Sequence, residues 1–471
     1  MDINKFEKFA KELIDWIVEY YNNIENFPVK SKVKPREIFN KIPDTPPQNS
    51  EPFEKIFSDF QQIIIPGITH WQSPKFFAYF PANTSFPSIL AELLTSAIAA
   101  QCMKWETSPA ATELEEKVLY WLRDMIGLPD YFLGVIQDTA STSTLVSILS
   151  ARESFTNYRI NESGFENNKF RVYCSTETHS SIEKAVKISG IGKSNLVKIP
   201  VDDKYSMIPT LLKESMEEDL AKGYIPLCII ATLGTTGSTA IDPLEEIGKI
   251  AKEFNLWLHI DAAFLGSALI LPEYKWILKG IEYADSFVFN PHKWLFTNFD
   301  CSAYFVKDVS ALVRTFEIIP EYLKTKSDKI TNNYCDWGIQ LGRRFRALKL
   351  WFVIRSYGVN GLKEKLRYHI SLAKKFVSLL SQSEGFEILA PVIANLICFR
   401  YKPKNISDEE KLNSINELLL HKINNTGKIY LSHTKLKGKF TLRMVIGQTY
   451  VSEKHIEEAY NIILENSKQI N

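Results

Sequence analysis

A lysine in an apolar setting is the feature of this sequence that most clearly suggests chemistry. Lys293 belongs to the run Asn-Pro-His-Lys-Trp at residues 290–294, which follows an apolar stretch and precedes Leu295 and Phe296. Most lysines are solvated at protein surfaces, whereas a lysine held among apolar groups loses its charge readily. The neutral amine is then a nucleophile that can form a Schiff base with an aldehyde. The segment therefore predicts a reactive amine.

A carboxylate stands about thirty residues upstream. Asp261 follows the apolar run Leu256–Ile260 and precedes Ala262 and Ala263. It could be an ordinary helix cap, or it could face a protonated ring nitrogen. At about 4 Å and an effective dielectric constant near 20, such an ion pair gains roughly 4 kcal/mol before desolvation. That pairing would keep a pyridinium protonated as an electron sink, and the small Ala263 would let a flat ring approach the backbone.

Two further polar segments could bind a flat, phosphorylated ligand. Residues 137–144 form a hydroxyl-rich turn before an apolar helix that we expect from Leu145 onward. Hydroxyls and free backbone N–H groups at a helix N-terminus bind phosphate, although an ordinary Ser/Thr cap is the commoner explanation. His179 follows the apolar run Phe170–Cys174. It could stack on a ring, although a lone histidine is more often structural.

The elements around these residues indicate an α/β protein. A helix is predicted from Pro109, after the N-cap residue Ser108, to a stop at Gly127. Beyond it, short strand-like runs alternate with helical stretches, a pattern typical of a mainly parallel sheet covered by helices. The polar residues lie at the ends of these runs, where open α/β sheets bind ligands. The runs are Phe170–Cys174, Leu227–Leu233, Leu256–Ile260 and Ser286–Asn290.

Three parts are predicted along the chain. Residues 1–75 read as amphipathic helices joined by a proline-rich extended stretch, a strap that must cover either the main body or a second subunit. Residues 76–350 form the large α/β domain. Residues 351–471 form a small α/β domain, with strands at Asn395–Tyr401, Lys428–Ser432 and Phe440–Ile446 and a terminal helix at Ser452–Asn466.

Composition excludes several classes of protein. The 471 residues are 45% hydrophobic and 24% charged, with a net charge of +1, so the charge gives no basis for binding nucleic acid or an anionic membrane. Six cysteines without a CxxC pair argue against a zinc ribbon and fit a reducing compartment. The N-terminus is neither a signal peptide nor a membrane span. Arg343, Arg344 and Arg346 are interpreted as interface or packing residues. We expect a cytoplasmic, multidomain enzyme with no metal.

Because these motifs occur in the same order, the chain resembles the group II pyridoxal-phosphate decarboxylases, specifically the aromatic-L-amino-acid decarboxylases. The resemblance implies an aspartate-aminotransferase-like fold (fold type I) and pyridoxal 5′-phosphate as cofactor. It also implies that the N-terminal strap wraps the partner subunit of a homodimer. The matching segments cover about residues 5–460 and lie at 76–81, 108–115, 178–181, 231–236, 259–263, 290–294 and 341–346.

The resemblance implies a role for each residue of the cofactor site. Lys293 would carry the cofactor, Asp261 would pair with the pyridine nitrogen, and His179 would stack above the ring. Tyr322, in an aperiodic polar loop, would donate the proton to the substrate Cα. The remaining cofactor residues are Ala263 below the ring, Thr232 beside it, and Ala140, Ser141, Asn290 and His292 at the phosphate.

The resemblance also implies an aromatic slot for the substrate. Its residues would be Trp71, Tyr79, Phe80, Pro81, Ala82 and Gly342, with Met103 from the partner subunit. Animal relatives carry threonine at position 82 and tend to carry phenylalanine at position 103, which weakens a dopa-specific interpretation. Gly342 matches the small residue of plant relatives with indole substrates. We therefore predict an aromatic-L-amino-acid decarboxylase that favours tryptophan-type substrates, with dopa, 5-hydroxytryptophan, tyrosine and phenylalanine as further candidates.

The alternatives come from other classes of protein. An aldehyde synthase on the same scaffold is marked in the family by replacement of the loop tyrosine or the stacking histidine, and this chain keeps Tyr322 and His179. An aminotransferase or desulfurase would need a carboxylate-binding arginine or a loop cysteine, and lacks the His-Lys-Trp context. A non-catalytic binding protein would be expected to have lost the lysine, the aspartate or the loop tyrosine.

Overall fold

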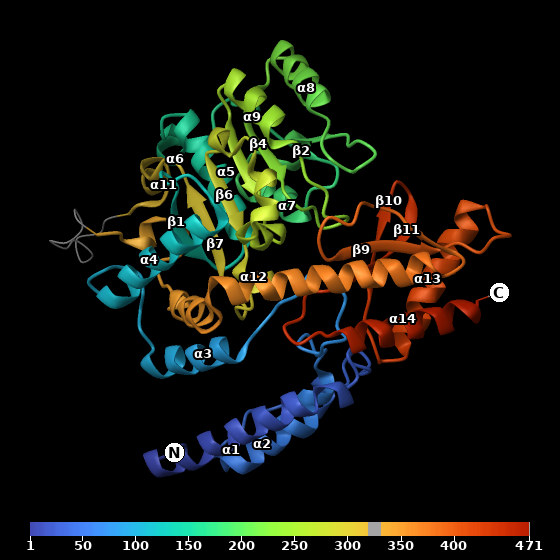
Figure 1. Ribbon diagram of the computed structural model, residues 1–471. Helices are drawn as coiled ribbons and strands as arrows, with labels where there is room; N and C mark the ends of the chain where they lie inside the picture. Colours follow the sequence, from blue (N-terminus) through green and yellow to red (C-terminus); the bar gives the residue numbers. More distant parts are fainter. Residues whose placement is uncertain (319–330, 471) are drawn as a thin grey trace. The chain divides into compact units, whose positions relative to one another are not determined.

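The computed structural model describes residues 1–318 and 331–470, which divide into two compact units (Figure 1). The large unit comprises Ala82–Ser371 and Ala390–Leu396. The terminal unit comprises Met1–Pro81, Leu372–Leu389 and Ile397–Asn471. The first residues of the chain therefore group with its last residues.

A seven-stranded sheet forms the centre of the large unit, in the order β1-β7-β6-β5-β4-β2-β3. The neighbours from β3 to β6 are parallel, and β7 runs antiparallel to both β1 and β6. The mainly parallel sheet predicted from the alternating runs is thus confirmed. The strands are β1 (Leu133–Gln137), β2 (Phe170–Ser175), β3 (Leu196–Ile199), β4 (Ile225–Thr232), β5 (Trp257–Asp261), β6 (Ser286–Phe289) and β7 (Ser302–Val306).

Helices cover this sheet and explain its apolar strands. Strands β4 to β6 are buried almost throughout, as expected for parallel strands covered on both faces. Helix α5 packs against strands β1 and β4 to β7. The helices of this unit are α3 (Phe86–Ile98), α4 (Pro109–Ile126), α5 (Ala140–Phe155), α6 (Arg159–Ser163), α7 (Ser180–Ile188), α8 (Pro209–Ala221), α9 (Leu244–Glu253), α10 (Pro291–Trp294), α11 (Val309–Phe316) and α12 (Arg346–Ser381), which continues into the terminal unit.

Local signals set the helix ends, with one correction. Helix α4 begins at Pro109 and stops at Gly127, whose φ of 81° is left-handed, as predicted. Helix α5 begins at Ala140, whereas the sequence predicted a start at Leu145. The reason is that the Thr139 hydroxyl accepts a hydrogen bond from the Thr142 N–H (3.5 Å). The hydroxyl-rich residues therefore form the first turns of the helix rather than a turn before it.

The terminal unit contains a four-stranded sheet in the order β10-β11-β9-β8. The predicted strand at Lys428–Ser432 is wrong except at Tyr430, which forms an isolated parallel bridge with Phe76, and at Ser432, where β10 begins. The Asn424 side chain bonds both the N–H and the carbonyl of Leu431, which keeps that residue out of a strand ladder. The elements are α1 (Ile3–Asn22), α2 (Phe53–Asp59), β8 (Phe386–Ile388), β9 (Leu396–Tyr401), α13 (Glu409–Asn425), β10 (Ser432–Leu436), β11 (Lys439–Val445) and α14 (Glu453–Lys468).

Aromatic side chains hold the N-terminal helices together within the terminal unit. Trp16 of α1 packs edge-on against Phe57 and Phe60. His455 of α14 contacts Glu25, which follows α1 (3.1 Å), so the N-terminal segment is also tied to the C-terminal helix. Within residues 1–318 and 331–470, no helix combines the length and the apolar character that crossing a membrane requires.

Gly266 provides a test of the packing behind the sheet edge. A Cβ at this position would lie 2.4 Å from the Cβ of Phe289 and 3.3 Å from that of Ala262, and both neighbours are fully buried. We expect Gly266→Ala to lower the free energy of unfolding by about 1–3 kcal/mol, the usual cost of overpacking. Urea denaturation measures this loss, and unchanged stability would contradict the packing described.

The matched control for that variant is Gly361→Ala. Gly361 lies inside helix α12, and the nearest atom to its added methyl is the Tyr357 Cβ at 3.7 Å. Alanine is favoured over glycine within helices by roughly 0.5–1 kcal/mol. This variant should therefore be as stable as the parent protein or slightly more stable.

Candidate active site

The carboxyl ends of three neighbouring parallel strands bring the predicted cofactor residues together in the large unit. Thr232 ends β4 and is the register partner of Asp261, which ends β5. Strand β6 leads into Asn290 and then into helix α10, which carries His292 and Lys293. Because parallel strands end at the same edge of a sheet, residues from three distant segments meet there.

Lys293 lies in an apolar environment, as the sequence predicted. Its backbone N–H donates to the Asn290 carbonyl (2.9 Å), and the following residues Trp294 and Leu295 are fully buried. Burial lowers the pKa of the Lys293 amine, and the nearby Asp261 carboxylate opposes that shift. A lowered pKa leaves more of the amine neutral near pH 7, which a nucleophile requires.

Asp261 is 5% exposed, and its Oδ1 accepts a hydrogen bond from the Ala263 N–H (3.0 Å). The Ala263 carbonyl in turn accepts from the Asn290 N–H (3.0 Å). The loop after β5 is therefore bonded directly to the segment that carries Lys293. This connection fixes the carboxylate and the amine relative to each other.

His179 occupies the N-cap position of helix α7. Its Nδ1 accepts a hydrogen bond from the Ser181 N–H (3.2 Å), so the neutral ring carries its proton on Nε2. Burial and the Lys293 charge lower the pKa of His179, while Asp261 opposes them. The imidazole therefore lies close enough to the amine and the carboxylate to respond to both charges. The residue also keeps a solvent-exposed surface, which a ring that stacks on a ligand needs.

His292 is a second neutral histidine. Its Nδ1 accepts a hydrogen bond from the Cys301 backbone N–H (2.9 Å). Burial, followed by the Lys293 charge, lowers the pKa of His292 to about 3. The ring is therefore uncharged near neutral pH, with its proton on Nε2 as a fixed hydrogen-bond donor.

The N-terminus of helix α5 is linked to the same strand ends. The Asn290 Oδ1 accepts from the Ser302 hydroxyl (2.7 Å), which lies 3.5 Å from the Ser143 hydroxyl of α5. Ala140 and Ser141 form the first turn of this helix, and Ser141 is exposed. Free backbone N–H groups in that turn favour an anion such as phosphate.

The residues present fit pyridoxal phosphate. The cofactor requires an amine for its aldehyde, a carboxylate for its ring nitrogen and donors for its phosphate, which Lys293, Asp261 and the first turn of α5 can supply. The Thr232 Oγ1 is buried and has no hydrogen-bond partner within the described residues. Burying a hydroxyl without a hydrogen bond costs free energy. A ligand bound beside Thr232 could supply the missing hydrogen bond.

The predicted slot residues are divided between the two units. In the terminal unit, the ring of Trp71 stacks on Tyr79 (5.7 Å between centroids) and on Phe76 (4.4 Å). Tyr79 has a φ of 54°, which is unusual for a bulky residue and typical of functional loops. Phe80 and Pro81, which are also in this unit, are buried.

The other slot residues belong to the large unit. The Met103 carbonyl accepts from the Cys335 N–H (2.9 Å). A Cβ on Gly342 would lie 3.4 Å from the Gln101 Nε2, so any side chain at 342 would contact Gln101. Ala82 is also in this unit. The assembly of these residues into one substrate slot stays a prediction.

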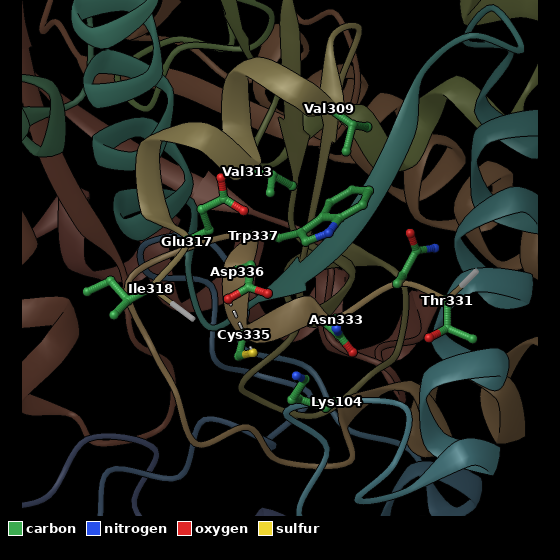
Figure 2. Close-up of a pocket in the computed structure, with 11 residues that line it drawn as sticks. Lys104, Val309, Val313, Glu317, Ile318, Thr331, Asn333, Cys335, Asp336 and Trp337 are labelled. Carbon is green, nitrogen blue, oxygen red and sulfur yellow. Dashed lines mark hydrogen bonds between the residues drawn. The ribbon is translucent and has the colours of Figure 1, made fainter. Parts of the chain in front are cut away.

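Tyr322 lies outside the described residues, and its role stays a prediction. Ile318 and Thr331, which flank the undescribed segment, line a cavity of about 210 Å³ together with Lys104, Asp336 and Trp337 (Figure 2). None of the predicted cofactor residues lines it. Sequence reasoning did not identify this cavity, although most of its lining residues lie in or beside the aperiodic stretch of the chain that also contains Tyr322.

Comparison with known proteins identifies the family. Residues 35–402 match the family described as the pyridoxal-dependent decarboxylase conserved domain. The chain is 43% identical to phenylacetaldehyde synthase of Arabidopsis thaliana, covering all of this chain and 97% of that protein. It is equally identical to tryptophan decarboxylase 2 of Oryza sativa subsp. japonica, covering all of this chain and 96% of that protein. The chain therefore belongs to the pyridoxal-dependent decarboxylases, in the aromatic amino acid decarboxylase group.

A solved structure confirms the predicted fold. The crystal structure of Oryza sativa TDC with PLP and tryptamine matches this chain with a TM-score of 0.97 and 35% identity, covering all of this chain and 99% of that one. The fold is thus the α/β, fold type I architecture predicted from the resemblance. The protein is a carboxy-lyase that uses pyridoxal 5′-phosphate.

The buried His259 makes the folding stability of the protein depend on pH. Its Nδ1 lies 2.9 Å from the Ser286 hydroxyl in β6, and burial lowers the pKa of His259 to about 4. In the unfolded chain this pKa is about 6.5. As the pH falls through that interval, the unfolded state takes up a proton that the folded state does not, so folding weakens by about 3 kcal/mol.

The test compares the wild type with His259→Asn in urea unfolding at pH 7 and pH 4.5. Because other groups also titrate in this range, the difference in pH dependence between the two proteins is the readout. We expect the variant to lose less stability on acidification, by about 2–3 kcal/mol. Equal losses would mean that His259 is not held neutral by the fold.

Proposed function

We propose that this protein decarboxylates an aromatic L-amino acid to the arylalkylamine and CO2, and that it favours tryptophan-type substrates. The observation that carries the proposal is the placement of Lys293 and Asp261 at adjoining strand ends, with His179 within range of both charges. Membership of the aromatic amino acid decarboxylase group supports the reaction class.

Each residue of the cofactor site has a physical task in this proposal. Pyridoxal phosphate, when bound, supplies an aldehyde for amines and a ring that accepts the electrons released with CO2. Lys293 would hold the cofactor and release it to the substrate amine. Asp261 would keep a proton on the ring nitrogen, because a carboxylate beside that atom favours its charged form. His179 would cover one face of the ring.

The phosphate would be bound by neutral donors. The first turn of α5 offers backbone N–H groups of Ala140 and Ser141, and His292 offers its Nε2 proton. Asn290 would add its side-chain amide, whose oxygen is held by Ser302. Thr232 and Ala263 would contact the ring from the ends of β4 and β5.

The substrate slot would be aromatic. Trp71, Tyr79 and Phe80 present flat side chains, which suit an aromatic amino acid. Ala82 and Gly342 are small and leave room for an indole. The tryptophan decarboxylase among the relatives and the tryptamine in the Oryza sativa structure support this preference.

We also propose that the protein is a cytoplasmic homodimer. Helix α3 leaves an apolar face exposed, and so does α1, which a second copy could cover. Six free, buried cysteines are consistent with a reducing compartment. The exposed apolar residues are Phe86, Leu90, Leu93, Leu94 and Ile98 on α3, and Ile3, Phe6, Ile14 and Val18 on α1.

An aromatic aldehyde synthase is the second candidate. It is favoured by the 43% identity to a phenylacetaldehyde synthase, which equals the identity to the tryptophan decarboxylase. The two activities share the loss of CO2 and differ in the product. Amine without peroxide indicates a decarboxylase, whereas aldehyde, ammonia and hydrogen peroxide indicate a synthase.

The deciding experiment incubates the holoenzyme separately with tryptophan, 5-hydroxytryptophan, dopa, tyrosine, phenylalanine, glutamate and histidine. We expect amines from the aromatic substrates, with tryptophan preferred, and none from glutamate or histidine. Lys293→Ala should be inactive, and borohydride reduction followed by peptide mass spectrometry should place the cofactor adduct on Lys293 of the wild type. An adduct on another lysine would refute the site.

Tyr322→Phe tests the proposed proton donor. This change keeps the ring and removes the phenol, so CO2 release should continue while the substrate Cα is left without its proton. Dissolved oxygen can then react at that carbon, giving aldehyde, ammonia and hydrogen peroxide in place of amine. Product analysis with a peroxide assay, in air and under argon, measures the switch. Amine formation at the wild-type rate would remove Tyr322 from the mechanism.

A further inference from the structure

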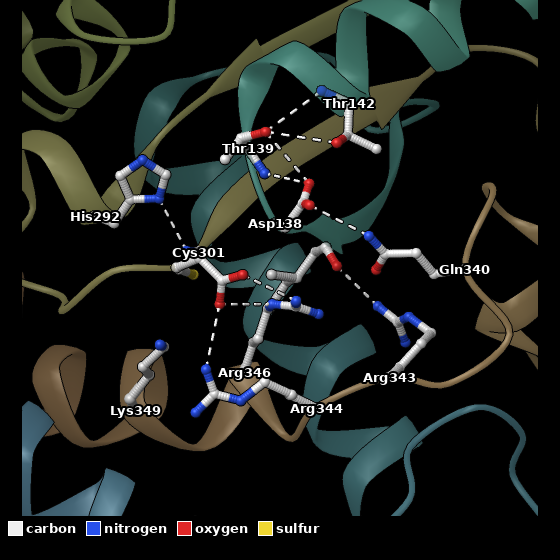
Figure 3. Close-up of polar contacts among 12 residues, drawn as sticks. Asp138, Thr139, Thr142, His292, Cys301, Gln340, Arg343, Arg344, Arg346 and Lys349 are labelled. Carbon is white, nitrogen blue, oxygen red and sulfur yellow. Dashed lines mark hydrogen bonds and ion pairs between the residues drawn. The ribbon is translucent and has the colours of Figure 1, made fainter. Parts of the chain in front are cut away.

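A buried ion pair involving Arg346 lies near His292 and Cys301 (Figure 3). Arg346, the first residue of α12, donates from Nε to Asp300 Oδ1 and from Nη2 to Asp300 Oδ2, both at 3.0 Å. The arginine and aspartate side chains are only 7% and 16% exposed. Arg344 adds a contact of 3.6 Å to the same carboxylate. Both oxygens of Asp300 are therefore held, and the carboxylate cannot rotate freely.

The backbone of Cys301, which follows Asp300, is bonded to His292 in both directions. The Cys301 N–H donates to the His292 Nδ1 (2.9 Å), and the Cys301 carbonyl accepts from the His292 N–H (3.3 Å). The Cys301 N–H belongs to the Asp300–Cys301 peptide, so its direction depends on how Asp300 is held. His292 in turn directly precedes Lys293.

The charges around this peptide favour the same arrangement. Burial raises the pKa of Asp300, but the hydrogen bonds and charge of Arg346, with Lys349 and Arg344, outweigh it and leave that pKa below its ordinary value. Asp300 is therefore ionised and remains paired. Lys349 is paired with Glu92 (2.8 Å). The bidentate partner of Asp300 is therefore Arg346.

Stability alone is a weak reason for such a pair. Replacing a buried ion pair by apolar residues is often neutral or stabilising, because desolvation offsets the Coulombic gain. What a bidentate pair supplies is a fixed geometry. Here the fixed group is the Asp300 carboxylate. The next residue, Cys301, supplies the backbone N–H that determines the His292 tautomer.

We propose that Arg346 and Asp300 are positioning residues for the cofactor site. Their ion pair orients the Asp300–Cys301 peptide, which keeps the His292 proton on Nε2 and holds Lys293 in place. The inference rests on the proposed role of Lys293 and His292 in cofactor binding, and it assigns to the first residue of α12 a function in that site.

The experiment uses two variants of the full chain. Asp300→Asn keeps the shape and removes the charge, and Arg346→Lys keeps the charge and removes the bidentate geometry. For each, the apoenzyme is titrated with pyridoxal phosphate to give a Kd, and the visible band of the loaded protein is followed against pH. We expect Kd to rise about five- to tenfold, the worth of one well-placed hydrogen bond, and the pH midpoint of the band to shift.

Arg367→Gln is the matched control. Arg367 makes the same bidentate contact with Glu273 in the large unit, at 2.8 and 2.9 Å, but on an exposed surface. Its loss should leave both the Kd and the band unchanged. If Asp300→Asn does not fold, because it leaves a buried arginine unpaired, Arg346→Lys carries the test alone.

The outcomes separate this inference from the proposed function. Variants that melt at a lower temperature but keep the wild-type Kd and band midpoint would show a purely structural pair and overturn the inference. A wild-type protein whose cofactor adduct does not map to Lys293 would instead refute the proposed site. A raised Kd and a shifted midpoint in both variants, with an unchanged control, would support the positioning role.

Discussion

The burial of an amine beside a carboxylate is the constraint on which the rest of this site depends. Lys293 and Asp261 come from neighbouring strand ends, and their positions are fixed by the parallel register of β4, β5 and β6. An amine without a partner in such a place would be costly to charge. The carboxylate reduces that cost, while burial lowers the pKa of the amine. The result is a nucleophile and a counter-charge in one rigid frame.

Neutral histidines surround this pair. The pKa values of His179, His259 and His292 are all lowered, with burial as the first cause. Each ring has a hydrogen-bond partner at Nδ1: Ser181 for His179, Ser286 for His259 and the Cys301 N–H for His292. Because they are uncharged, these rings can act as directed donors and flat surfaces without disturbing the balance between lysine and aspartate.

The comparisons show why the fold alone does not decide the reaction product. The chain is as similar to a phenylacetaldehyde synthase as to a tryptophan decarboxylase. Both chemistries therefore use one scaffold, and a few side chains near the cofactor must separate them. In the proposed mechanism the difference lies in how the substrate carbon is treated after CO2 leaves, and the phenol of Tyr322 would be one of the groups on which that depends.

Local patterns in the sequence determined strands β2, β4, β5, β6, β9 and β11, the ends of helix α4 and the apolar setting of Lys293, because each depends on neighbouring residues. The start of α5 was misplaced, since the Thr139 cap turns a hydroxyl-rich segment into helix. Only the tertiary structure could decide the pairing of Asp300 with Arg346. These residues are 46 positions apart, and the sequence indicated no more than an interface or packing role for the arginine. Such a pair forms because the fold buries both charges together, and neither the periodicity nor the spacing of residues in the sequence predicts this pairing.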